Sequence, residues 1–242
     1  MAGHSKWANI KYRKEKSDKL KGKLFSRITK EIISSVRIGG PDPKANPRLR
    51  VAMQKAKAAN LPNENVQRNI KKASSPDQAD FIEATYEIYG HGGVGIFVEA
   101  LTDNKNRTAS DMRIATNKKG GNIANPGAVA FNFERKGIIQ IPKKDIAEEK
   151  LFLDATESGA EDFETAGDLF LITTAPDELF QVKEKLASLG YPIEAAELEM
   201  IPKNVVECDP ETVKANLELI DWLENLDDVD AVYHNMNLSQ YS

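Results

Sequence analysis

The residues with the strongest chemical bias are the lysines and arginines between Gly3 and Lys72. This stretch holds 19 basic and five acidic residues, a net charge of +14, so the rest of the chain carries −18 of a total of −4. A concentrated positive field attracts polyanions, and nucleic-acid phosphates are the usual target. Short charge runs are usually solvated helix faces, but an excess of this size predicts a nucleic-acid-binding surface.

The predicted contacts are basic side chains and one aromatic residue of this stretch. Trp7 has two possible roles: it stacks on a base, or it anchors an N-terminal arm through buried area. The predicted nucleic-acid-binding residues are Lys6, Trp7, Lys11, Arg13, Lys14, Lys21, Lys23, Arg27, Lys30, Arg48, Arg50, Lys55, Lys57, Arg68, Lys71 and Lys72.

A second polar run, residues 102–108, precedes a predicted helix. Capping of that helix by Asp103 or Asn104 accounts for much of its composition. The other reading is a surface contact loop, in which Lys105 and Arg107 supply the charge.

The sequence gives little indication of a metal site, a cofactor site or a catalytic site. His4, His91 and His234 are far apart and Cys208 is the only cysteine, so we expect no metal site, and we expect no cofactor. Residues 90–95 spell Gly-His-Gly-Gly-Val-Gly, the dinucleotide fingerprint, but β-forming residues follow instead of a helix, which favours a glycine-rich hairpin. No catalytic constellation is evident, so a non-enzyme is expected. An enzyme with a site between α/β modules remains the alternative class.

The bulk composition predicts a cytoplasmic protein without a membrane segment. No apolar run approaches the roughly 20 residues that span a bilayer, and the N-terminus lacks a signal-peptide core. A single cysteine is typical of a reducing compartment. We expect a monomer without a small-molecule substrate.

The residue pattern predicts a multidomain α+β protein. Apolar residues three or four apart, with Gly39-Gly40-Pro41 and Asn46-Pro47 as helix boundaries, predict a basic three-helix bundle with an N-terminal arm in residues 1–76. A period of two then predicts strands at 83–89, 94–101 and 128–133, with a helix at 106–118 between the last two.

Residues 138–201 show the β-α-β-β-α-β order of the ferredoxin-like split motif. Its expected elements are strands at 138–141, 162–165, 169–174 and 193–200 and helices at 143–158 and 177–189. A helix at 210–225 and a strand at 229–235 complete the earlier sheet. The predicted domains are therefore 1–76, a discontinuous α/β domain of 77–135 plus 204–242, and an inserted ferredoxin-like domain of 136–203; both α/β domains are expected to be ferredoxin-like.

Several motifs in order give the chain a specific resemblance. They are GHSKWANIK, KGKLFSR…KEI, GG-PDPKANPRLR, KAKAANLPNENVQRNIKKA and YG-x-GGV…LTDNKNRT…KKGGN. Together they resemble the YebC family, the bacterial relatives of the mitochondrial translational activator of cytochrome oxidase subunit one. The chain departs from the family pattern at His91, at residues 124–127 and at Asn132.

The resemblance implies three domains and a role without enzymatic residues. The family is described as DNA-binding transcriptional regulators, and also as ribosome-associated factors that relieve stalled translation. The expected function is thus a nucleic-acid-binding regulator of gene expression, acting on DNA in transcription. The alternative is a translation factor that binds ribosomal RNA and the ribosome.

Overall fold

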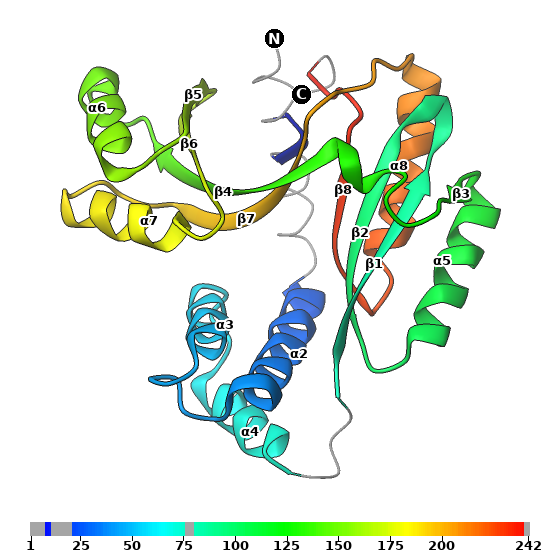
Figure 1. Cartoon of the computed structure of the whole chain (residues 1–242), viewed down its shortest axis with the longest axis horizontal. Coiled ribbons are helices and arrows are strands. Elements are labelled where there is room, and N and C mark those ends of the chain that lie inside the picture. Colours follow the sequence, from blue (N-terminus) through cyan, green and yellow to red (C-terminus); the bar gives the residue numbers. More distant parts are fainter. Residues whose placement is uncertain (1–7, 11–20, 76–79, 240–242) are drawn as a thin grey trace. The chain divides into compact units, whose positions relative to one another are not determined.

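A computed structural model describes residues 8–10, 21–75 and 80–239, and it has the expected mixed α+β architecture (Figure 1). The chain divides into two compact units. The first comprises Tyr12–Val129 and Cys208–His234, and the second comprises Met1–Lys11, Ala130–Glu207 and Asn235–Ser242. The first unit thus groups the helical bundle with the first sheet, and the three predicted domain boundaries stay a prediction.

Three helices form the N-terminal part of the first unit: α2 (Lys21–Gly39), α3 (Pro47–Ala58) and α4 (Asn63–Ala73). Their apolar faces meet in a core that includes Ile32, Leu49 and Val66. The Asn46 side chain accepts a hydrogen bond from the Leu49 amide and donates to the carbonyls of Ser35 and Gly40. The cap expected for α3 therefore also ties it to the end of α2.

The first unit also holds an antiparallel sheet with the order β3-β1-β2-β8. Helices α5 and α8 pack against each other beside it. The bounds are β1 (Ile82–Tyr89), β2 (Gly95–Thr102), α5 (Lys105–Lys119), β3 (Asn122–Ile123), α8 (Pro210–Glu224) and β8 (Val229–His234).

This sheet does not follow the ferredoxin-like order that was expected for both α/β domains. A one-turn helix, η1 (His91–Gly93), joins β1 directly to β2, and the Gly90 amide bonds to the Val94 carbonyl. Such a short connection makes the two strands antiparallel neighbours, whereas in a ferredoxin-like unit a crossover helix joins the first two strands. The same turn confirms the glycine-rich hairpin, since η1 leads into a strand and Gly92 and Gly93 have positive φ.

The second unit contains a four-stranded antiparallel sheet with the order β5-β6-β4-β7. Together with its two helices this is the expected β-α-β-β-α-β arrangement. The bounds are β4 (Phe133–Pro142), α6 (Glu148–Ser158), β5 (Asp162–Ala166), β6 (Leu169–Thr174), α7 (Leu179–Ser188) and β7 (Ala195–Pro202).

Two expected elements were wrong in detail. Of the strand expected at residues 128–133, only Phe133 is in a strand, as the first residue of β4; a short helix, η2 (Ala130–Asn132), precedes it. The amides of Gly127 and Val129 bind the Glu87 carboxylate at 2.6 Å each, so a side chain and not a neighbouring strand satisfies this backbone. Helix α6 begins at Glu148 and not at residue 143, because the Lys143 amide bonds to the Asp168 carbonyl.

Candidate nucleic-acid interface

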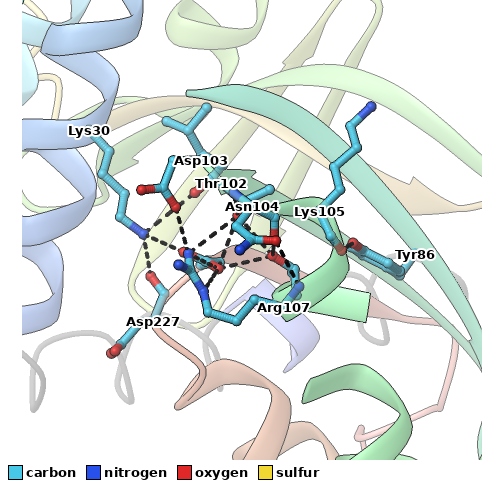
Figure 2. Close-up of polar contacts among 11 residues, drawn as sticks. Lys30, Tyr86, Thr102, Asp103, Asn104, Lys105, Arg107 and Asp227 are labelled. Carbon is cyan, nitrogen blue, oxygen red and sulfur yellow. Dashed lines mark hydrogen bonds and ion pairs between the residues drawn. The ribbon is translucent and has the colours of Figure 1, made fainter. Parts of the chain in front are cut away.

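Two predicted contacts on α2 are engaged within the first unit. Lys30 Nζ lies 2.9 Å from Asp228 Oδ1 and donates to the Asp227 carbonyl at 2.7 Å (Figure 2). Arg27 Nε donates to the Val229 carbonyl at 3.0 Å. Both side chains therefore connect the helical part of the unit to the start of β8.

Asp228 is the centre of a polar cluster. Its side chain is only 5% exposed. Arg107 reaches its Oδ2 through Nη2 at 2.7 Å and Nε at 3.1 Å, and the hydroxyls of Thr102 and Thr108 donate to the same oxygen. Burial alone would raise the pKa of Asp228, but hydrogen bonds from Arg107, Lys30 and Thr108 outweigh it and lower the pKa to about 2. The carboxylate thus stays charged and holds both basic groups.

The residues of the predicted contact loop have different roles. Asn104 caps α5 by accepting a hydrogen bond from the Arg107 amide, as one of the two expected capping residues. The Arg107 guanidinium bonds to Asp103 and Asp228, and these hydrogen bonds raise its pKa. Lys105 points away from this cluster in Figure 2 and is exposed. Both loop residues are exposed, but within the described residues Arg107 is held in ion pairs and Lys105 is not.

Helix α3 carries its basic residues on two flanks. Arg48 pairs with Glu83 and Lys55 with Glu31, each at 2.8 Å. Arg50 and Lys57 are two turns apart, and so lie on one flank of the helix. Both are exposed, and within the described residues neither pairs with an acid; Arg50 bonds only to the carbonyls of Pro43 and Lys44. We call this pair the open flank of α3.

Helix α4 adds basic residues at its C-terminal end. Lys71 and Lys72 lie in its last turn, where cations interact favourably with the helix dipole. Both are exposed, and no acid in the described part of the chain pairs with them. Arg68, one turn earlier, bonds to the Asn65 side chain at 2.9 Å.

The remaining predicted contacts are not described structurally. Lys6, Trp7, Lys11, Arg13 and Lys14 lie outside the described residues, and the side chains of Lys21 and Lys23 are not described either.

The sequence interpretation missed the role of Asp228. The pair Asp227-Asp228 reads as an ordinary solvated acidic pair, yet Asp228 is buried. No local signal reveals this, because its basic partners are 121 and 198 residues away. Across residues 8–10, 21–75 and 80–239, no cluster of histidine, cysteine and acidic side chains is arranged to hold a metal ion. None of the described helices is long and apolar enough to span a bilayer.

The fold and the basic surfaces define a class: a multidomain α+β protein with a basic N-terminal helical bundle. Residues 5–76 match the model of the TACO1/YebC protein N-terminal domain, and residues 81–236 match that of the TACO1/YebC second and third domain. The chain belongs to the TACO1/YebC family, which confirms the resemblance read from its motifs.

Full-length relatives agree with this assignment. A protein of Protochlamydia amoebophila named a probable transcriptional regulatory protein is 66% identical over 240 residues, covering 99% of this chain and 98% of that protein. A Chlamydia pneumoniae protein with the same description is 59% identical, over 98% of this chain and all of its own. The crystal structure of a conserved hypothetical protein from Aquifex aeolicus is 45% identical, covers 90% of each chain and gives a TM-score of 0.81.

Proposed function

We propose that this protein is a non-enzymatic regulator of gene expression that binds duplex DNA through its N-terminal basic residues. The observation that carries the proposal is the segregation of charge, +14 in residues 3–72 against −18 elsewhere. The names of its relatives, transcriptional regulatory proteins, support DNA as the target and regulation as the outcome. It acts in the cytoplasm, as a monomer and without a small-molecule substrate.

The ion pairs among the described residues support a smaller set of proposed contacts. Lys30 and Arg107 are held by Asp228, and Arg48 and Lys55 are each paired with a carboxylate. The proposed contacts among the described residues are therefore the open flank of α3, the end of α4 and Lys105. All are exposed side chains that meet phosphates without first breaking an ion pair. Contacts of this kind give affinity without reading base sequence.

The open flank provides a matched experiment. The double variant Arg50→Ala/Lys57→Ala removes two exposed basic side chains, and Arg48→Ala/Lys55→Ala removes two of the same types that are paired with acids. Both change the net charge equally, so they have the same effect on the long-range field. Duplex-DNA affinity is measured between about 50 and 200 mM salt. The open-flank variant is expected to lower the slope of log affinity against log salt by about two units.

The control variant is expected to change that slope by clearly less. Equal slopes in the two variants would contradict the assignment of the open flank as a contact surface. The same variants are tested for co-sedimentation with ribosomes. Loss of ribosome binding with unchanged DNA binding would replace the transcriptional role by the translational one, since both polyanions satisfy the same charge chemistry.

A further inference from the structure

A pocket on the surface of the first unit lies between the end of α5 and the C-terminal half of α8. Its volume is about 320 Å³, which is within the range of ligand pockets. Four of its residues are spaced three and four apart along α8 and its C-cap, and therefore share one face of that helix. The lining residues are Lys119, Glu218, Asp221, Trp222, Asn225 and Leu226. We call this pocket the α8 pocket.

A cation from the same chain already lies in the α8 pocket. Lys119 Nζ is 5.9 Å from the centroid of the Trp222 ring and 3.0 Å from Glu218 Oε2. An ammonium group within about 6 Å of a tryptophan ring is attracted by the negative face of that ring. The pocket thus offers an aromatic face and a carboxylate to the same positive charge.

The end of helix α8 also favours a cation. The carbonyl groups at a helix C-terminus carry partial negative charge. The last turns of α2, α3, α4 and α5 each contain a lysine or an arginine, whereas the last turn of α8, residues 221–224, contains two acids and no basic residue. The cation beside this end of α8 comes instead from α5, as Lys119.

Lys119 is weakly held. Its side chain is 30% exposed and that of Glu218 is 50% exposed, and an ion pair so open to water contributes little to stability. A guanidinium group suits the same surroundings better than an ammonium group. It is planar, it stacks on aromatic rings, it bonds to a carboxylate through two N–H groups, and it is more weakly hydrated.

We propose that the α8 pocket binds an arginine side chain of a partner protein, and that Lys119 is the internal cation which this arginine replaces. The guanidinium group stacks on Trp222 and donates hydrogen bonds to the Glu218 carboxylate. The site is separate from the proposed function, because none of the basic residues proposed as DNA contacts lines the pocket.

The replacement of Lys119 is tested with two neighbouring lysines. Lys118 is exposed and does not line the pocket, so Lys118→Ala and Lys119→Ala change the net charge equally. The ligand is a fluorescent arginine–glycine repeat peptide, and its affinity is measured by anisotropy at about 150 mM salt, which screens non-specific attraction. Lys119→Ala is expected to bind the peptide roughly two- to tenfold more tightly than Lys118→Ala, the range for removing one competing cation from the ring and the carboxylate.

The role of the ring is tested without a change of charge. Trp222→Leu is expected to weaken binding of the arginine peptide roughly two- to fivefold, and to bring it closer to the affinity of a lysine–glycine repeat peptide of the same length. A second measurement does not depend on the folding of this variant. In a Trp7→Phe background Trp222 is the only tryptophan, and its fluorescence should change as the arginine peptide is added.

Three results would overturn the proposal. The first is equal peptide affinity in Lys118→Ala and Lys119→Ala, or unchanged Trp222 fluorescence at saturating peptide. The second is a change of Trp222 fluorescence with single-stranded oligothymidine that is lost in Lys119→Ala, which would make the pocket a nucleotide site. The third is self-association of Lys119→Ala in light scattering, which would assign the arginine to a second copy of this chain. The DNA affinity of the open-flank variant tests the proposed function separately from all three.

Discussion

Lys30 on α2 and Asp228 just before β8 are 198 residues apart in sequence, yet Nζ and Oδ1 are 2.9 Å apart. The ammonium group also meets two backbone carbonyls, those of Asp227 and, at 3.5 Å, Leu101. One basic side chain thus joins the helical part of the first unit to strand β2 and to the two residues just before β8 (Figure 2).

Replacing Lys30 is expected to affect stability and not binding. In Lys30→Ala, Asp228 keeps Arg107 but loses one charged donor, which costs about 1–3 kcal/mol. For a chain of this size that corresponds to a melting temperature lower by roughly 2–10 °C. The salt dependence of DNA binding should stay at the wild-type slope, because Lys30 is already paired. Lys57→Ala is the control, with an unchanged melting temperature and a reduced slope; the reverse pattern would contradict both assignments.

Asp228 gives the protein an acid-sensitive contribution to stability. Its folded pKa of about 2 lies below the ordinary value of 3.8. The contribution is complete above about pH 4 and is lost as the pH falls from about 4 to 2. The shift corresponds to roughly 2–2.5 kcal/mol. Denaturant unfolding of Asp228→Asn between pH 2.5 and 7 should show the largest loss at neutral pH and a smaller one at pH 2.5; a constant difference would contradict the shifted pKa.

Asp230 is expected to have the opposite effect on the pH dependence of stability. Burial on β8 raises its pKa to about 6, and Arg27, Lys30 and Lys55 offset this only partly while Glu31 adds to it. The folded state holds this proton longer than the unfolded chain, so stability is lost as the pH rises from about 4 to 6.

The variant Asp230→Asn should therefore be more stable than wild type at pH 7.5 and equal to it at pH 4. We expect a gain of about 1–2 kcal/mol, or roughly 2–8 °C in melting temperature. Thermal melts at the two pH values check this. A variant that is less stable at pH 7.5 would mean that the charged carboxylate makes a favourable contact there.

Replacing Asn46 should lower the stability of the fold more than replacing an ordinary helix cap. Its side chain caps α3 and also donates to two carbonyls at the end of α2, and the residue is 3% exposed. Asn104 caps α5 in the same way but is exposed. Asn104→Ala is expected to cost about 1 kcal/mol. Asn46→Ala should cost at least about 1 kcal/mol more, because it leaves buried carbonyls without donors. Equal losses in chemical denaturation would contradict the bridging role.

Much of the fold could be predicted from local pattern. The apolar spacing of Ile28, Ile32 and Val36 indicated the buried face of α2, and Asn46-Pro47 indicated the start of α3. These signals work because a helix repeats every 3.6 residues and its end groups need nearby caps. Local pattern failed at residues 128–133, where Glu87, some forty residues away, satisfies the backbone amides.

The sequence by itself determined the family, the α+β class and the separation of a basic N-terminal stretch from an acidic remainder. These features depend on composition and on the short hydrophobic periods of helices and strands. Both can be read without knowing which distant residues meet in the fold. Only the tertiary structure decided which charged side chains form ion pairs. Arg48 and Arg50 are alike and two residues apart, but they point to different sides of α3, and among the residues that the structure describes only the first meets a carboxylate, that of Glu83. Ion pairing depends on distances of a few ångströms between residues far apart in sequence, and folding alone sets those distances.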